Sequence, residues 1–383
     1  MDTPIKQPIG NTSIQSATIS NLRFPMIVAV VFIHALGNLE VVAPHYDSSF
    51  SGIDLYNLIR ITFSIVLPSI AVPIFFIISG FLYFNNIKEW SIRIYKKKIQ
   101  RRFHSLVLPY VLWNAIALLI PLGVVIKRSL SQHAFTPDFL LDSMQGLRWL
   151  WNIYINDLNH PNLLGAPTYL SSPINYPLWF LRDLICMSVL SPIVYYWVRL
   201  TRIYGIILLG ICYITNIFPF ISGLKIDAIF FFTLGAWFSI QTKGLLTCLL
   251  PHQHTLAIGS LLLGITSIYC YGDIVYPTAL VQPLFTITAT LYAFVAMAKM
   301  VEKGYTTKPL LKHSCFFIYA IHTLLILDFS TILTERLFFQ NNSICYLLRY
   351  LTCPILIIGS CILIYYCSAR CFPRLTRLLT GNR

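Results

Sequence analysis

The sequence is poor in charge, above all in acidic residues. Only 11% of its 383 residues are charged and only 14 are Asp or Glu, whereas about 25% of the residues of a soluble domain are charged. The apolar fraction is 56%, and the mean hydropathy is +0.70. Because an ordinary soluble core cannot absorb this excess of apolar residues, the composition excludes a soluble globular domain and favours a membrane protein.

The sequence also lacks the patterns of a disulfide framework and of a zinc site. Cysteines such as Cys186 and Cys361 lie within apolar runs, where they behave as small hydrophobic side chains. His252 and His254 stand two residues apart, but no cysteine or carboxylate completes a zinc pattern around them. We therefore expect no metal ion and no tightly bound cofactor.

Long apolar runs, by contrast, are abundant, and each is long enough to cross a hydrocarbon core of about 30 Å. They predict an all-α polytopic membrane protein with about ten spanning helices. The first run lacks a cleavage site of small residues, so we interpret it as a span and not as a signal peptide. We expect a polar N-terminal tail at 1–21, one membrane domain at 22–369 and a basic C-terminal tail at 370–383. The expected spans are 22–40, 58–84, 103–126, 177–198, 203–221, 227–241, 255–271, 278–298, 314–333 and 344–367.

The net charge of +14 is best explained by topology. With both termini in the cytoplasm, the segments on that side carry 20 of the 28 Lys and Arg residues, as the positive-inside rule requires. The excess of positive charge therefore predicts orientation and contact with membrane lipids, and it does not indicate a nucleic-acid partner.

Arg23 and His34 lie on one face of the first expected span. Eleven residues at 100° per residue amount to about three turns, so both side chains point the same way, about 16 Å apart along the helix. Ionisable residues at such depth normally face a bundle interior or a water-filled cavity. An imidazole there can act as a general base near neutral pH. A histidine that only hydrogen-bonds between helices is the alternative.

Several short motifs in the N-terminal third resemble, in order, elements of the acyltransferase-3 family of membrane-bound O-acyltransferases. Arg23 and His34 have the Arg-x10-His spacing of that family. Residues 73–81, PIFFIISGF, resemble the end of its second helix, and a basic run leads into Leu-Pro-Tyr at 108–110. Looser similarity continues to about residue 330.

The later similarity lies in Pro-Leu-Trp-Phe-Leu at 177–181 and in a Tyr-x-x-His element formed by Tyr319 and His322. The resemblance implies an enzyme of the bacterial cytoplasmic membrane. Such an enzyme takes an acyl group, usually acetyl, from cytoplasmic acyl-CoA as cosubstrate. It delivers this group across the membrane to a hydroxyl of a cell-envelope glycan or of a lipid-linked sugar.

A basic cluster precedes the third expected span. The basic pair of the family, three residues apart, corresponds to Lys98 and Arg101, with Arg102 adjacent. This cluster could bind the phosphates of coenzyme A, or it could serve only topology and lipid binding. Earlier in the chain, Ser79 and Gly80 close the second span, where glycine permits either close approach of a ligand or tight helix packing.

Three further residues complete the expected site. Tyr319 and His322 share a helix face and could contact the pantetheine arm, although a histidine satisfied between helices is the alternative. Asp183 could orient His34 or contact a sugar hydroxyl, and an ion pair with the neighbouring Arg182 is equally compatible with its position. Asp328, six residues beyond His322, is another carboxylate that could meet His34, and the sequence does not decide between the two.

The longest expected loop, 127–176, is rich in aromatic residues, which could stack on a sugar or, as we favour, lie at the membrane interface. These residues are Trp149, Trp151, Tyr154, Tyr169 and Tyr176.

The mechanism that we predict is direct transfer. Acyl-CoA would bind from the cytoplasm on Arg23 and the basic cluster, and His34 would deprotonate the acceptor hydroxyl as it attacks the thioester. A two-step route through an acyl-histidine stays open. The main alternative function is a transporter or flippase of lipid-linked saccharides, because intramembrane His, Arg and Asp also mark translocation paths.

Overall fold

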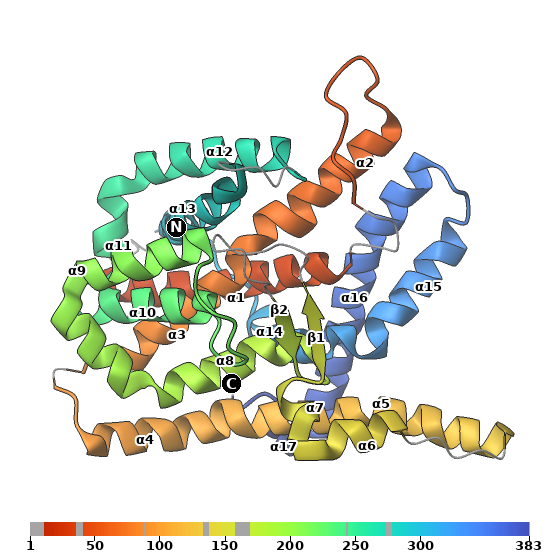
Figure 1. Cartoon of the computed structure of the whole chain (residues 1–383), viewed down its shortest axis with the longest axis horizontal. Helices are drawn as coiled ribbons and strands as arrows, with labels where there is room; N and C mark the ends of the chain where they lie inside the picture. The colour runs from red at the N-terminus through yellow and green to blue at the C-terminus, as the bar shows by residue number, and fades with distance from the viewer. Residues whose placement is uncertain are drawn as a thin grey trace, which may run out of the picture.

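The computed structural model describes residues 11–35, 41–87, 89–132, 138–157, 169–242, 244–272 and 278–382. Nearly all regular structure in these ranges is helical (Figure 1). The helices are α1 (Asn11–His34), α2 (Gly52–Arg60), α3 (Ala71–Phe84), α4 (Ile92–Arg102), α5 (Leu108–Gln132), α6 (Asp138–Met144), α7 (Arg148–Trp151), α8 (Trp179–Val189), α9 (Ser191–Thr215), α10 (Ile226–Ile240), α11 (Leu245–Leu249), α12 (Gln253–Tyr269), α13 (Val281–Glu302), α14 (Pro309–Ile321), α15 (Leu327–Leu337), α16 (Ser343–Cys371) and α17 (Pro373–Leu379).

One antiparallel hairpin interrupts the helical pattern. Strands β1 (Tyr154–Asp157) and β2 (Tyr169–Ser172) pair within the long loop before α8. Residues 158–168, which connect them, and residues 133–137 lie outside the described residues. The loop expected at 127–176 therefore contains regular structure: the end of α5, the short helices α6 and α7, and this hairpin.

Eight helical segments of the described residues are long and apolar enough, by length and composition, to cross a membrane. The shorter α10 is also strongly apolar. These findings confirm an all-α polytopic membrane protein, and the orientation of the termini stays a prediction. The eight segments are Ser13–His34, Gly52–Phe84, Ile92–Lys127, Ser191–Thr215, Leu245–Tyr269, Val281–Glu302, Pro309–Leu337 and Ser343–Cys371.

Two of these segments are broken. In α9, Arg202 has a φ of 53°, and a Cβ added at Gly205 would press on Trp197 and Thr201, so the chain turns back on itself there. The expected spans 177–198 and 203–221 correspond to the two sides of this break, with α8 leading into the first. A second break, at Leu324 and Leu325, separates α14 from α15.

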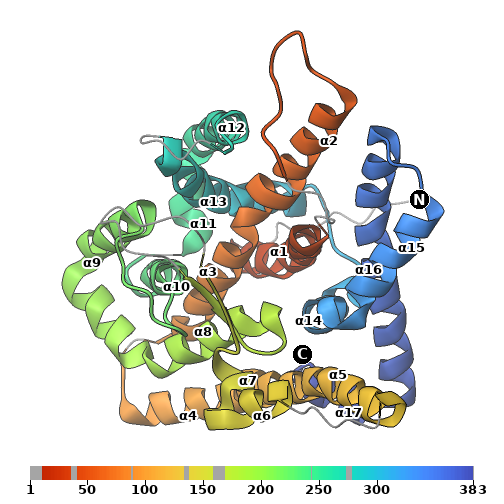
Figure 2. The same ribbon diagram turned by 45° about the vertical axis from the view of Figure 1, so that its right-hand side comes forward.

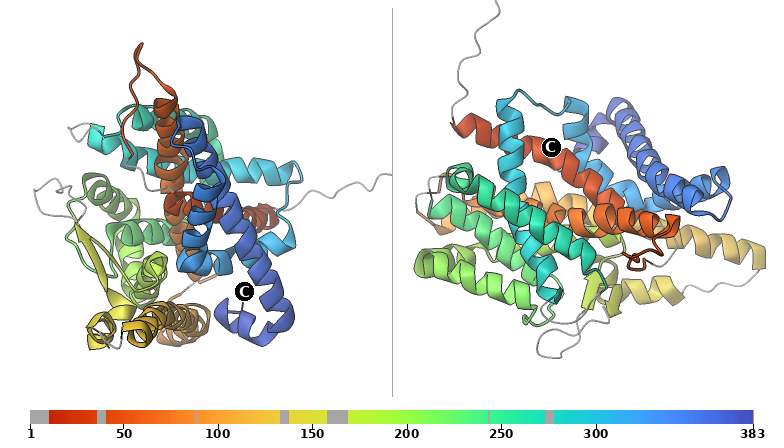
Figure 3. Two further views of the ribbon diagram at one scale, coloured as in Figure 1. Left: turned by 90° about the vertical axis from the view of Figure 1, so that its right-hand side faces the viewer. Right: turned by 90° about the horizontal axis from the view of Figure 1, so that it is seen from above.

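Helix α1 (red) passes through the middle of the bundle, as Figures 1 and 2 show, and contacts α3, α13, α14 and α16. Helices α9 and α16 stand at opposite edges of the bundle (Figures 1 and 3). Helices α4 and α5 are joined by a π-helical stretch, Phe103–Val107, and form one long rod. The central position of α1 places Arg23 and His34 inside the protein.

The expected tails differ from the structure at both ends. Helix α1 begins at Asn11, and Thr18 and Asn21 are buried, so residues 11–21 belong to the bundle; residues 1–10 lie outside the described residues. The polar composition suggested a tail, but Asn21 Oδ1 accepts a hydrogen bond from the Thr307 amide at 2.8 Å. At the other end, α17 packs on α5, where Trp113 Nε1 donates to the Leu379 carbonyl at 2.9 Å.

Candidate functional site

A cavity of about 600 Å³ lies between α1, α3, α8 and α14, beside the π-helical stretch that follows α4. We call it the central cavity. Its basic lining side chains are Arg23, Arg102 and Lys312, with His313 beside them. The rest of its wall is mainly apolar and includes Ile27, Val30, Phe75, Ile78, Leu82, Phe180, Leu184 and Phe316.

Along both α1 and α14, the residues that line the cavity pass from basic to mainly apolar in the direction of the chain. In α1, Arg23 comes first and Val30 follows, and His34 lies four residues further, about 6 Å along the axis. In α14, Lys312 comes first, Tyr319 follows, and His322 comes directly after the helix. Each helix therefore leads from a basic side chain, past apolar wall, to a histidine.

The two histidines lie close together, about one helical turn beyond Val30 and Tyr319, the last lining residues of the two segments. The ring centres of His34 and His322 are 5.2 Å apart. Nδ1 of His322 lies 2.9 Å from the Tyr319 carbonyl oxygen and 3.1 Å from that of Ile318. Because a carbonyl only accepts hydrogen bonds, Nδ1 of His322 carries the hydrogen and Nε2 is an acceptor. That Nε2 is buried and has no partner among the described residues.

The hydroxyl of Tyr176 also contacts the His34 ring. It lies 3.3 Å from Nδ1 of His34, and the two rings meet edge to face at 5.0 Å. Asp183, one of the carboxylates that could have oriented His34, makes its contacts elsewhere. The contacts of the described residues join Asp183 to Arg182, through Nε at 3.0 Å and Nη2 at 2.9 Å.

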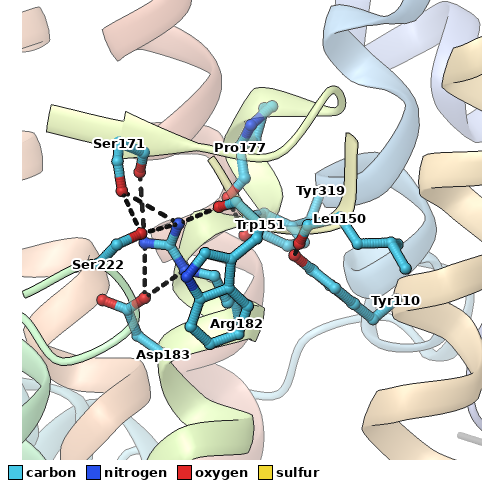
Figure 4. A network of polar contacts seen from close by, with 9 residues as sticks. All are labelled: Tyr110, Leu150, Trp151, Ser171, Pro177, Arg182, Asp183, Ser222 and Tyr319. Atoms are coloured by element: carbon cyan, nitrogen blue, oxygen red, sulfur yellow. Dashed lines mark hydrogen bonds and ion pairs between the residues drawn. The ribbon is translucent and has the colours of Figure 1, made fainter. Parts of the chain in front are cut away.

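Arg182 and Asp183 belong to a buried network that holds the long loop against α8 (Figure 4). Arg182 Nη1 donates to the Trp151 carbonyl at 2.5 Å, to Ser171 Oγ at 3.1 Å and to Ser222 Oγ at 3.2 Å. Their neighbours Leu181 and Leu184 line the central cavity. The ion pair that the sequence allowed as an alternative is therefore present.

Of the basic cluster Lys98, Arg101 and Arg102, only Arg102 lines the cavity. Arg102 lines the cavity, and its Nη2 lies 3.5 Å from the Ser79 carbonyl oxygen. Ser79 lines it too. Lys98 instead donates to the Tyr83 carbonyl, and Arg101 is exposed and does not line the cavity. The structure thus brings Arg102, Ser79, Arg23 and Tyr319 together, without Lys98 or Arg101.

Gly80 faces a neighbouring helix. A Cβ at this position would clash with the carbonyl oxygen of Phe232 in α10, and one at Gly235 would clash with that of Ile77 in α3. Helices α3 and α10 therefore approach each other closely through two glycines. Of the two roles that the sequence allowed for Gly80, the structure supports tight packing.

Three residues near the site did not stand out as site residues in the sequence. Lys312 appeared only as one of many basic residues, His313 gave no signal, and Tyr176 was one of several loop aromatics. The contacts of Tyr176 depend on how a loop folds back onto α1, and no local periodicity reports such a contact.

Comparison with protein families identifies the kind of protein that carries this site. Residues 17–369 match the acyltransferase-3 model, described as an acyltransferase domain. The chain belongs to the acyltransferase-3 family. The match confirms the resemblance seen in the short motifs, and it favours an acyltransferase over a transporter or flippase.

One curated relative of this acyltransferase is the succinoglycan biosynthesis protein ExoH of Rhizobium meliloti (strain 1021). The two proteins are 24% identical over 230 residues, which cover 59% of this chain and 54% of the relative. The match thus spans about half the length of that relative. No solved structure matches the chain.

Proposed function

We propose that this acyltransferase transfers an acyl group, in particular acetyl, from cytoplasmic acyl-CoA to a hydroxyl of a cell-envelope glycan or a lipid-linked sugar. The observation that carries the proposal is the central cavity, whose lining along α1 runs from the basic Arg23 to Val30, about one helical turn before His34. The name of the relative ExoH, a succinoglycan biosynthesis protein, supports a glycan acceptor. We place the enzyme in the bacterial cytoplasmic membrane, surrounded by lipid.

The lining of the cavity suits the parts of acyl-CoA. Arg23, Arg102 and Lys312 offer cationic donors for phosphate oxygens, and arginine can bind them with two parallel hydrogen bonds. The apolar wall between these residues and His34 would cover the uncharged pantetheine arm. Tyr319 contributes to that wall, which is compatible with the expected pantetheine contact. The thioester would then lie beside His34.

The reaction needs only a base at this position. His34 takes the proton of the acceptor hydroxyl as its oxygen attacks the thioester carbonyl carbon. The new carbon–oxygen bond forms, the carbon–sulfur bond breaks, and the coenzyme A thiolate leaves. The thiolate then takes the proton from His34. The products are the O-acyl ester and free coenzyme A, and no metal ion or tightly bound cofactor takes part.

Purified enzyme in lipid nanodiscs, mixed with radiolabelled acetyl-CoA and lipid-linked saccharides from the source membrane, tests this function. We expect release of coenzyme A thiol together with transfer of label to the saccharide. A folded enzyme that neither binds nor consumes any acyl-CoA would contradict the donor assignment. Mass spectrometry of envelope glycans from deletion and complemented strains tests the acceptor, because loss of an O-acyl group in the deletion strain would identify it.

A further inference from the structure

Tyr176 joins the long loop to the end of α1. It opens a single turn, Tyr176–Leu178, directly before α8. Its hydroxyl lies 3.3 Å from Nδ1 of His34, and its ring meets the imidazole at an angle of 77°. This contact links an aromatic residue of the loop to the residue that we assign as the base.

The backbone on both sides of Tyr176 is held in place. The Asn175 amide donates to Asn114 Oδ1 in α5 at 3.1 Å, and Asn175 Nδ2 donates to the Ala320 carbonyl in α14 at 2.9 Å. On the other side, the hydroxyl of Tyr319 donates to the Pro177 carbonyl, as Figure 4 shows. Asn175 itself is 1% exposed. The position of the phenol is therefore set by two helices of the bundle.

A neutral imidazole carries one hydrogen, and the partner of one nitrogen decides which nitrogen is free to act as a base. Among the described residues, the candidate partners whose rings contact His34 are Tyr176 and His322. Nδ1 of His322 is held by the carbonyl groups of Ile318 and Tyr319. Its Nε2 makes no hydrogen bond to His34, whereas the Tyr176 hydroxyl is within hydrogen-bond distance of the His34 ring. Burial, reinforced by the carboxylate of Asp328, raises the pKa of Tyr176 to about 12. The phenol therefore stays neutral at physiological pH.

We propose that Tyr176 is a positioning residue for His34. Its phenol oxygen accepts the hydrogen on Nδ1 of His34, which leaves Nε2 of that ring free to take the proton of the acceptor hydroxyl. The inference rests on the proposed acyl transfer. It gives to Tyr176 the orienting role that the sequence suggested for Asp183, and it explains why the loop is fastened to α5 and α14 on either side of this residue.

Tyr176→Phe removes the hydroxyl and keeps the ring contact with His34. We expect kcat to fall by about 10- to 100-fold, the size of effect that follows a misplaced catalytic group, with an unchanged KM for acetyl-CoA. Tyr110→Phe is the matched control, because its hydroxyl bonds the same loop at the Leu150 carbonyl without touching His34. The control should keep kcat near that of the wild type. Equal losses in both variants would assign Tyr176 a purely structural role.

A double-mutant cycle with His34→Gln tests whether the two residues act together. If Tyr176 acts through His34, Tyr176→Phe should cause no further loss of the residual rate in the His34→Gln background. Additive losses would overturn the proposal.

Nitrogen-15 spectra of histidine-labelled enzyme test the hydrogen bond independently of activity. We expect the ring signals of His34, assigned by their absence in His34→Gln, to report hydrogen on Nδ1 and to shift in Tyr176→Phe. Unchanged signals would overturn the inference even in a fully active enzyme. A wild-type enzyme that consumes no acyl-CoA would instead contradict the proposed function.

Discussion

The imidazole rings of His34 and His322 lie 5.2 Å apart, although they come from opposite ends of the chain. Asn21, thirteen residues before His34 in α1, bonds Thr307, just before the start of α14, so α1 and α14 run side by side in the same direction. Each brings a basic side chain, Arg23 or Lys312, to the central cavity before its histidine. The binding path that we propose is thus formed by two parallel helices.

His34→Ala should reduce acyl transfer by at least about 10²- to 10⁴-fold, the contribution of a positioned general base. Binding of coenzyme A and thermal stability should remain close to wild type, because the basic end of the cavity is unchanged. Steady-state kinetics, calorimetric binding and a melting curve would measure the three quantities. A variant that retains its rate but loses about 1 kcal/mol of stability would show that His34 is a packing residue.

Arg102→Gln should raise the KM for acetyl-CoA by about tenfold or more, with little change in kcat. Removal of a charge-assisted hydrogen bond that stabilises the ground state and the transition state equally has this signature. Arg101→Gln is the matched control, because the adjacent Arg101 does not line the cavity, and its KM should be close to that of the wild type. A larger effect at Arg101 than at Arg102 would contradict the placement of coenzyme A.

The contrast between Arg101 and Arg102 also shows how far helical periodicity carries a prediction. Arg23 and His34 lie on one regular helix, so their shared face could be derived from an angle of 100° per residue. Directly after Arg102 the chain enters the π-helical stretch Phe103–Val107. Its wider turn rotates the faces of α4 relative to those of α5, so the face of α4 that meets the cavity cannot be extrapolated from the span that follows. The sequence could therefore identify the cluster but not the arginine that lines the cavity.

The sequence alone does not reveal the partner of His34, and the physical reason is different. Asp183 was a natural candidate because a buried carboxylate suits an imidazole, but the cavity face of α8 belongs to Leu181 and Leu184. Tyr176 reaches His34 only because the backbone of the preceding Asn175 is fastened to α5 and α14. Such long-range contacts depend on the assembled bundle and leave no pattern in the local sequence.

Gly80→Ala should destabilise the bundle by about 1–3 kcal/mol, the usual effect of overpacking, because the added methyl group would clash with the Phe232 carbonyl. Gly259→Ala in α12 is the control, since no atom lies within 4 Å of its added Cβ, and its melting temperature should not fall. If Gly80 served close approach of a ligand instead, its variant would melt normally and show a raised KM for acetyl-CoA.

Asp183→Asn should act mainly on stability. Asp183 and Arg182 are 0% and 1% exposed, and removal of one partner of a buried ion pair costs about 3–5 kcal/mol because the other charge stays buried. Asp142→Asn is the matched control: Asp142 pairs with Arg148 at 2.5 Å, but both side chains are partly exposed, and such pairs contribute about 0–1 kcal/mol. Melting curves in nanodiscs should therefore show a large loss of stability for Asp183→Asn and a small one for Asp142→Asn.

The correctly folded fraction of the Asp183 variant should retain the wild-type kcat, because the carboxylate contacts Arg182 and not His34. A variant with normal melting and a kcat reduced by about 10²-fold or more, the range of a lost acid–base group, would return Asp183 to the catalytic site and contradict its structural role.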